Sequence, residues 1–287
     1  MSGKVTGRSI TSSLVTTMYA EPSVTAGMCT GVAITISGGH LQYLDSDVAT
    51  LADLNMHLPA GKWTCLLGRS GCGKTSLLRY LAGLLDEKVT WSGALTIMPA
   101  CDLHGACDLH GQVAYMAQQD LLMPWLTVLD NVMLSQRFGE HAVDAQRADN
   151  AKQRALDLLA RVGLADKADY RPSQLSGGMR QRVALARTLM QDKPIVLMDE
   201  PFSALDAVTR HKLQNLACEL LQDKTVVLIT HDPQEAIRLA DALYIMQGHP
   251  AAVRALTVPA SATPRDYDAD CAALQQAILT RLERDDE

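Results

Sequence analysis

The segment Gly68-Arg69-Ser70-Gly71-Cys72-Gly73-Lys74-Thr75 matches the pattern G-x-x-x-x-G-K-[ST] without a mismatch. Glycines let the backbone turn tightly, so that successive N–H groups face phosphate oxygens. A lysine in this place reaches the outer phosphates, and the threonine hydroxyl is a magnesium ligand. The segment therefore predicts a nucleoside triphosphate site, to which we assign Gly68, Ser70, Gly71, Cys72, Gly73, Lys74, Thr75 and Ser76. We interpret Cys72 as a small filler residue, because the phosphates need backbone donors here and no nucleophile.

A second phosphate-type segment is Leu175-Ser176-Gly177-Gly178-Met179, where a hydroxyl and two glycines lead into a helix. The start of a helix attracts anions. An ordinary Ser-Gly helix cap is the alternative interpretation. Two such helix starts in one chain could serve the same nucleotide if two copies of the chain met head to tail.

Two acids follow a buried apolar strand at 195–198. Asp199 is placed to hold Mg²⁺, and Glu200 is placed as the general base for an attacking water. His231 follows another apolar strand, and the carboxyl ends of parallel strands face the ligand crevice. The alternatives are a solvated pair of acids and a structural histidine.

The elements that must position these residues follow from hydrophobic periodicity. A strand at 63–67 and a helix at 75–85 flank the glycine-rich loop, and further helices are expected at 207–222 and 233–241. Apolar runs predict buried parallel strands at 195–198, 225–229 and 243–246. Alternation at 32–36 and 51–58 predicts edge strands of an antiparallel unit, and 127–190 is mostly helical. The fold class is therefore α/β: a P-loop NTPase core of parallel strands with an antiparallel β subdomain and a helical insertion subdomain.

Composition excludes several classes of protein. With 26 basic and 32 acidic residues the net charge is −6, which argues against a nucleic-acid-binding protein. No apolar run approaches the roughly 20 residues that span a bilayer. Seven scattered cysteines and the lack of a convincing secretion signal indicate the cytosol. The repeat Cys-Asp-Leu-His-Gly at 101–105 and 107–111 is either a metal site or, as we favour, a duplicated surface loop.

Over residues 30–250 these motifs, in this order, resemble the ATP-binding subunit of an ABC transporter. The resemblance implies ATP and Mg²⁺ as cofactors and makes 175–179 the signature motif. It implies that Gln118 senses the γ-phosphate and contacts the metal, and that His231 is the switch histidine, catalytic together with Glu200 and Gln118. It further implies that Asp206 lies in a dimer-contact loop and that Tyr43 stacks on adenine.

The stretch 121–132 and the tail 259–282 are similar to those of bacterial importers of nitrate, sulfonate, taurine or thiamine precursors. Pro124-Trp125 is either an exposed docking surface or part of the core. The expected organisation is a loose tail at 1–28, an ATPase domain at 29–250 with its helical subdomain at about 120–190, and a short tail at 251–287. The expected partners are transmembrane permease subunits, a periplasmic substrate-binding protein and a second copy of the chain, but no nucleic acid.

The resemblance also implies a peripheral position on the cytoplasmic face of the inner membrane. Three alternatives stay open: an exporter subunit, a soluble ABC ATPase outside transport, and a catalytically silent binding module. The Pro-Trp stretch disfavours an exporter subunit. The net charge of −6 and the short helical insertion disfavour a soluble ABC ATPase outside transport. The presence of Glu200 and His231 disfavours a silent binding module. The transported solute cannot be read from the chain, because other subunits select it.

Overall fold

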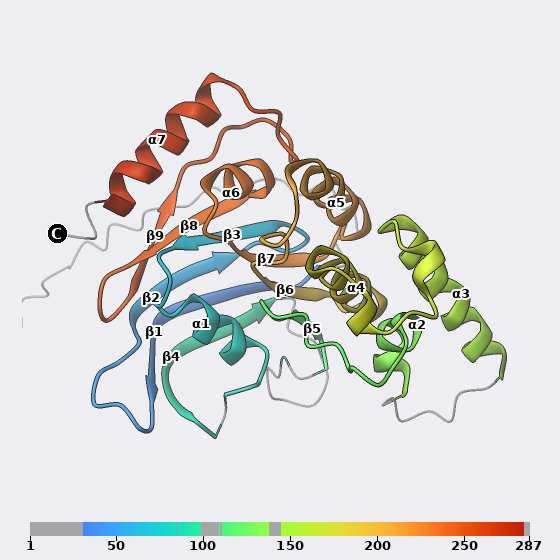
Figure 1. Cartoon of the computed structure of the whole chain (residues 1–287). Coiled ribbons are helices and arrows are strands. Elements are labelled where there is room, and N and C mark those ends of the chain that lie inside the picture. The colour runs from blue at the N-terminus through green and yellow to red at the C-terminus, as the bar shows by residue number, and fades with distance from the viewer. Residues whose placement is uncertain (1–30, 86, 99–108, 110, 138–144, 284–287) are drawn as a thin grey trace, which may run out of the picture.

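The computed structural model describes residues 31–85, 87–98, 109, 111–137 and 145–283, and its strands form two sheets (Figure 1). The Cys-Asp-Leu-His-Gly repeat at 101–111, apart from Leu109 and Gly111, and the expected tail at 1–28 fall outside these residues. None of the helices described is both long and apolar enough to cross a membrane.

The larger sheet has six strands in the order β5-β6-β7-β3-β8-β9. Its first five strands run parallel, and β9 is antiparallel to β8. The bounds are β3 Trp63–Gly68, β5 Val113–Met116, β6 Ile195–Asp199, β7 Thr225–Ile229, β8 Ala242–Gln247 and β9 Ala252–Leu256. Every residue of β3, β6 and β7 is buried, as their apolar runs predict for strands covered on both faces.

The smaller sheet is antiparallel, with the order β2-β1-β4. Its strands are β1 Ala33–Tyr43, β2 Leu51–Leu58 and β4 Val89–Met98. Alternate residues of β2 are buried, which is the pattern of a sheet with one face in the core. The two antiparallel strands expected from the sequence are confirmed, but β1 is not an edge strand, because it pairs with both β2 and β4. Strand β1 also extends further than expected.

Helices α4, α5 and α6 lie over one face of the larger sheet, and α1 lies on the other face together with the smaller sheet (Figure 1). The helices are α1 Lys74–Leu81, α2 Val128–Val132, α3 Ala145–Arg161, α4 Gly177–Met190, α5 Ala207–Leu220, α6 Pro233–Leu239 and α7 Ala269–Glu283. The insertion carrying α2 and α3 packs against α4, as the contacts among these three helices show. The Asp232 side chain caps α6 by accepting from the backbone amide of Gln234, and proline takes the first helical position.

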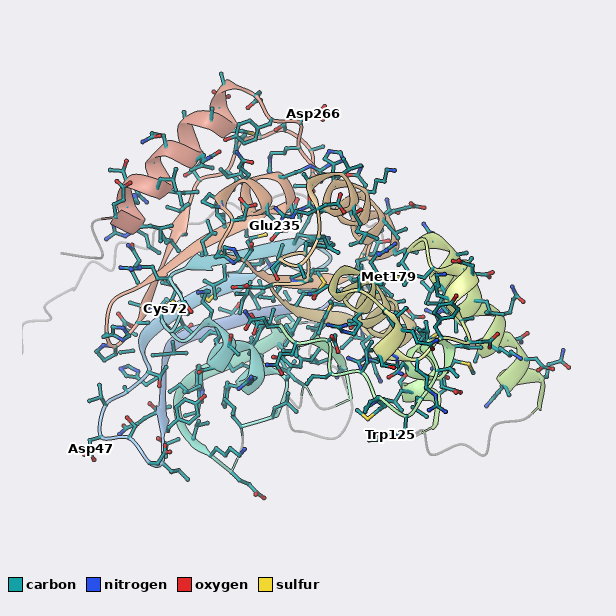
Figure 2. The ribbon with its side chains drawn as sticks, viewed as in Figure 1. Asp47, Cys72, Trp125, Met179, Glu235 and Asp266 are labelled. Carbon is teal, nitrogen blue, oxygen red and sulfur yellow. The ribbon has the colours of Figure 1, made fainter. Side chains whose placement is uncertain are left out.

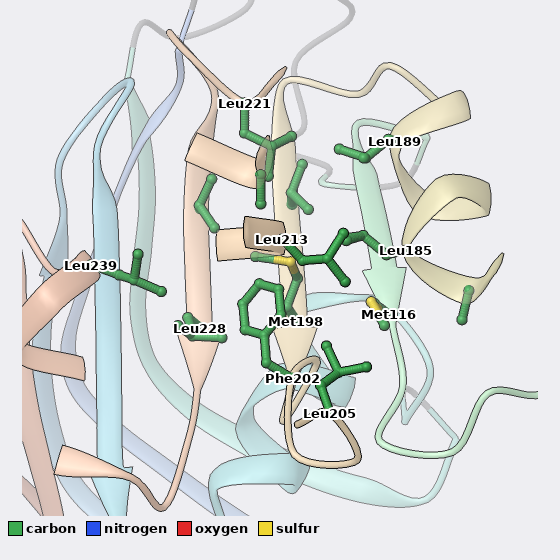
Figure 3. Packing of buried hydrophobic residues seen from close by; sticks show 14 of the residues in the cluster. Met116, Leu185, Leu189, Met198, Phe202, Leu205, Leu213, Leu221, Leu228 and Leu239 are labelled. Atoms are coloured by element: carbon green, nitrogen blue, oxygen red, sulfur yellow. The ribbon is translucent and has the colours of Figure 1, made fainter. Parts of the chain in front are cut away.

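Two hydrophobic clusters fill the space on either side of the larger sheet. Along β6, Val196 and Met198 belong to the cluster under the helices, whereas Ile195 and Leu197 belong to the cluster facing β1 and β2. Successive side chains of a strand point to opposite faces, so a wholly apolar strand joins two cores. Figure 3 shows part of the first cluster, where Met198 and the fully buried Phe202 lie among leucines of neighbouring elements.

Helix α1 is shorter than the sequence predicts, because a glycine ends it. Gly83 has a left-handed φ of 69°, its amide donates to the carbonyl of Tyr80, and the amide of Leu84 donates to that of Arg79. This is the Schellman arrangement, which satisfies the last carbonyls of a helix. Leu84, which would continue the apolar spacing of the helix, is 54% exposed as a result.

The chain after residue 250 contributes to the core. Strand β9 extends the larger sheet, and Cys271 and Ile278 of α7 are buried in the cluster under the helices. The Arg265 guanidinium is buried and donates to the carbonyls of Ile237 and Ala240 at the end of α6. The hydrophobic core therefore includes residues of the segment 251–287, which the sequence analysis describes as a short tail.

Candidate active site

The predicted phosphate-loop, metal and catalytic residues gather at the carboxyl edge of the larger sheet, because four neighbouring parallel strands end there. Strand β3 leads into the glycine-rich loop and β6 ends at Asp199. Strand β7 precedes His231, and β5 precedes Gln118. The order β5-β6-β7-β3 places these four ends side by side, in the crevice where open α/β sheets bind their ligands.

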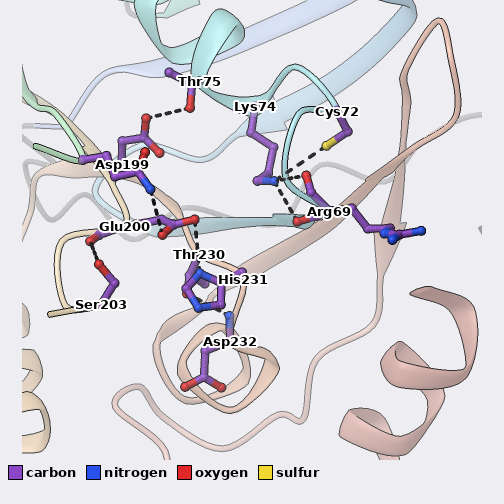
Figure 4. A network of polar contacts seen from close by, with 12 residues as sticks. Arg69, Cys72, Lys74, Thr75, Asp199, Glu200, Ser203, Thr230, His231 and Asp232 are labelled. Atoms are coloured by element: carbon purple, nitrogen blue, oxygen red, sulfur yellow. Dashed lines mark hydrogen bonds and ion pairs between the residues drawn. The ribbon is translucent and has the colours of Figure 1, made fainter. Parts of the chain in front are cut away.

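The glycine-rich loop has a backbone that other residues would not tolerate. A Cβ on Gly68 would lie 2.6 Å from the carbonyl oxygen of Met246, and Gly73 precedes α1 with a φ of 103°. Lys74 is buried, and its ammonium donates to the carbonyls of Gly68 at 2.7 Å and Arg69 at 2.6 Å (Figure 4). The loop is therefore folded around its own lysine, with the start of α1 behind it, which is the arrangement of an anion site.

Thr75 and Asp199 place two hard oxygen atoms side by side. The Thr75 hydroxyl donates to the Asp199 carboxylate at 2.7 Å, and Asp199 is only 2% exposed. Burial raises the pKa of the Asp199 carboxyl, with the neighbouring Glu200 charge adding to the effect and the Thr75 hydrogen bond opposing it. Mg²⁺ prefers such hard oxygen donors and takes one or two from protein beside phosphate and water, so this pair fits Mg²⁺.

Glu200 is the centre of the polar network drawn in Figure 4. It has an uncommon left-handed φ of 48°, and its amide donates to the carbonyl of Ile229. The side-chain amide nitrogen of Gln118, Nε2, donates to one oxygen of the Glu200 carboxylate at 3.3 Å. Nδ1 of His231 lies 3.1 Å from the other oxygen. A non-glycine residue in this backbone region marks a place where the surrounding structure maintains strain. The carboxylate is thus held from two sides, between β5 and β7.

Tyr43 lies beside the phosphate loop. Its hydroxyl is 2.9 Å from that of Ser76, one residue past Thr75 in α1. Tyr43 ends β1 and is partly exposed, so the antiparallel sheet brings an aromatic ring to the mouth of the loop. The position is compatible with the adenine-stacking role predicted from the sequence.

Ser176, Gly177 and Asp206 stand apart from this network. The Ser176 hydroxyl accepts from the amide of Met179 and caps α4, and Asp206 caps α5 in the same way. The hydrogen bond from the Thr209 amide lowers the pKa of the Asp206 carboxyl. In the part of the chain that the structure describes, no hydrogen bond joins the Ser176 or Asp206 side chain to Lys74 or Glu200. Gly178 packs closely, since a Cβ there would lie 3.3 Å from the Ala204 carbonyl oxygen.

Trp125 is not part of the core, because its side chain is 67% exposed, and Figure 2 shows its place on the molecule. Leu121, nearby in sequence, is 53% exposed. The loop around them is firmly held. The buried Asn131 side chain accepts from the amide of Met123 and donates to the carbonyls of Met123 and Thr127. Sequence reasoning missed this role of Asn131, although a polar residue among apolar ones in a helix start was a signal.

Comparison with known proteins supports a nucleotide-binding site at this edge of the sheet. A family model described as ABC transporter matches residues 51–203. The chain belongs to the ABC transporter family. The expected α/β fold with its antiparallel subdomain and the expected ABC-type ATPase domain are confirmed.

Among its relatives, an uncharacterized ABC transporter ATP-binding protein of Haemophilus influenzae is 42% identical over 80% of this chain and 90% of that protein. An aliphatic sulfonates import ATP-binding protein of Mesorhizobium japonicum is 42% identical over 82% of this chain and 84% of that protein. Among solved ABC structures, a dimeric cassette in a post-hydrolysis state bound to ADP and phosphate matches with a TM-score of 0.66 and 30% identity. That match covers 79% of this chain and 100% of the cassette.

Proposed function

We propose that this chain is the ATP-hydrolysing subunit of an ABC importer, which powers solute uptake through separate transmembrane permease subunits. The observation that carries the proposal is the Glu200 carboxylate, held between Gln118 and His231 beside the Asp199–Thr75 pair. These residues combine a general base, a metal ligand pair and a phosphate loop at one edge of the sheet, which is the set that phosphoryl transfer to water needs.

The contacts support the following roles. The phosphates bind to the glycine-rich loop, where Lys74 provides the positive charge. The other residues assigned to the loop or to its continuation are Gly68, Ser70, Gly71, Cys72, Gly73 and Ser76. Asp199 and Thr75 would hold Mg²⁺, with Gln118 beside them as the family resemblance implies, and the metal would neutralise charge on the transferred phosphoryl group. Glu200 accepts the proton of the attacking water, and His231, within 3.1 Å of Glu200, orients that carboxylate.

Import is favoured by the relatives. Several carry names of aliphatic sulfonate import proteins, and one of Synechocystis, 39% identical over 76% of this chain and 75% of that protein, is named a bicarbonate transport ATP-binding protein. The partners would then be permease subunits and a periplasmic substrate-binding protein, with this chain bound at the cytoplasmic face of the inner membrane. Mg²⁺-dependent phosphate release by the complex with its permease, stimulated by the loaded binding protein, tests the proposal. A rate of ATP hydrolysis that does not change when the loaded binding protein is added would contradict import.

We further propose that Ser176, Gly177 and Asp206 act across a head-to-tail dimer, because they lie outside the network of their own chain. A Gly177→Asp chain should bind ATP through its own phosphate loop but fail to form the closed dimer. The new carboxylate would face the partner's phosphate, and like charges in a water-poor interface cost several kcal/mol. Size-exclusion chromatography with ATP measures the dimer.

The substitution is a clean probe, because a Cβ on Gly177 meets only the far end of Arg180 at 3.9 Å. Gly177→Ala is the matched control for size and should fold normally. Mixing Gly177→Asp with Lys74→Ala places both lesions in one composite site and leaves the other intact, so partial activity should return. A mixture that forms no dimer with ATP would count against the shared site.

The exposed Trp125 is proposed as a contact for the permease. Trp125→Ala should leave the ATPase activity and melting temperature of the isolated chain nearly unchanged, since substitutions of exposed side chains usually shift stability by less than about 0.5 kcal/mol. Binding to the permease should weaken by about 30-fold, because a tryptophan at the centre of an interface is typically worth about 2 kcal/mol or more. Co-purification with the permease measures this effect. Leu44→Ala, which removes another strongly exposed apolar side chain, is the control.

A further inference from the structure

A cavity of about 230 Å³ lies at the amino edge of the larger sheet, opposite the edge that carries Glu200. Its walls come from α3, from the end of α4 and the turn into β6, and from the end of α5 and the turn into β7. Figure 3 shows two lining residues, Leu189 and Leu221, at the end of the hydrophobic cluster away from Phe202. The cavity is therefore distinct from the proposed nucleotide site.

The inner wall of the cavity is apolar. It is formed by Leu158 of α3, Leu189 of α4, Val196 of β6 and Leu221 before β7, and each of these residues is at most 7% exposed. A leucine-lined cavity of about 150 Å³ is large enough to bind benzene. A cavity of about 230 Å³ therefore has room for one aromatic ring and a small polar group.

The exposed part of the lining carries a bridge of charged side chains. Asp192, in the turn before β6, accepts Nζ of Lys224 at 3.0 Å and a guanidinium nitrogen of Arg154 at 3.4 Å. The hydrogen bond from Lys224 lowers the pKa of the Asp192 carboxyl, so the carboxylate is charged at neutral pH. The bridge joins α3 of the helical insertion to the two turns that enter β6 and β7.

The charges around the cavity do not cancel. Four basic and two acidic side chains line it, and one acid outside the lining, Glu219, pairs with Arg161 at 2.7 Å. One positive charge is left over. Lys193 is the lining cation that no ion pair engages within the described part of the chain, and its side chain is partly buried. A concave site with a surplus of one positive charge favours an occupant with one negative charge.

We propose that this cavity binds a small organic monoanion, in which one ionised acid group is attached to an apolar body the size of a benzene ring. The body packs against Leu158, Leu189 and Val196, and the acid group accepts from Lys193 and from the cations of the bridge. Hydrogen bonds between charged groups are stronger than neutral ones, so the charge gives selectivity. The proposal goes beyond the proposed function and does not depend on ATP hydrolysis.

Benzoate is the probe, because it joins one ring to one carboxylate. Benzamide has nearly the same shape without the charge, and acetate has the charge without the ring. With ADP present in excess and the ionic strength held constant, about 10 mM benzoate should raise the melting temperature of the full chain by about 2 °C, the shift expected for a dissociation constant of about 1 mM. Benzamide and acetate at the same concentration should each give less than half of this shift.

Lys193→Gln removes the unpaired charge and should weaken benzoate binding by about tenfold in isothermal titration calorimetry, as the loss of a charged hydrogen bond does. Lys212→Gln is the matched control, because Lys212 is exposed on α5 and does not line the cavity. This variant should bind benzoate as the wild type does. The melting temperatures without benzoate show whether both variants are folded.

Methyl NMR locates the bound probe. Benzoate should shift the methyl resonances of Leu158, Leu189 and Val196 and leave those of Leu77, in the cluster on the other side of the sheet, unchanged. Absence of stabilisation by benzoate, or equal stabilisation by benzamide or acetate, would overturn the proposed ligand class. Unchanged affinity in Lys193→Gln, or shifts confined to other methyl groups, would overturn the site. A chain that binds benzoate here but does not hydrolyse ATP would contradict the proposed function alone.

Discussion

Replacing Glu200 by glutamine is expected to lower ATP turnover by about 10²–10⁴-fold, the usual contribution of a general base. Glutamine has the same shape and can still meet His231 and Gln118, which lie 3.1 and 3.3 Å from the carboxylate. ATP binding should therefore persist, and the nucleotide-bound dimer should accumulate because it cannot hydrolyse its ligand. Steady-state phosphate release and size-exclusion chromatography with ATP measure the two effects.

Glu219→Gln provides the control for loss of one carboxylate. Glu219 is exposed on α5 and paired with Arg161, away from the sheet edge that carries Asp199. Its substitution should leave turnover unchanged. Wild-type turnover in the Glu200→Gln chain would remove Glu200 from the role of base and leave the proposed mechanism without one.

Lys74→Ala is expected to weaken ATP binding by at least about 10²-fold, because the lysine provides charged hydrogen bonds worth about 1.5–3 kcal/mol each. In the structure its ammonium is buried within hydrogen-bond distance of the carbonyls of Gly68 and Arg69. The backbone N–H groups of the loop cannot replace this charge beside the outer phosphates. Equilibrium titration with a fluorescent ATP analogue measures the loss.

Because Lys74 also satisfies two loop carbonyls, the melting temperature of the variant must be compared with that of the wild type. Lys193→Ala, which removes a lysine near the far end of the sheet before β6, controls for the change in net charge. Unchanged ATP affinity in a folded Lys74→Ala chain would contradict the role of the loop as the phosphate site.

Much of the fold could be predicted from local sequence. The apolar runs at β6 and β7 and the alternation in β2 are properties of neighbouring residues, and burial follows from them directly. The glycine-rich loop was equally visible, because glycines, lysine and threonine at fixed offsets have few other uses. The end of α1 was missed, since the apolar spacing continues to Leu84 while Gly83 already turns the chain.

The arrangement of the site depended on tertiary structure. Gln118, Glu200 and His231 follow three different strands, and only the strand order β5-β6-β7 brings their side chains within hydrogen-bond distance. The exposure of Trp125 and the pairing of Asp192 with Arg154 likewise depend on residues far along the chain. The sequence by itself determined which residues can bind phosphate and metal, because that chemistry belongs to residue types and short spacings. Only the folded chain decided which of them meet, because contacts between distant segments are set by sheet order and packing.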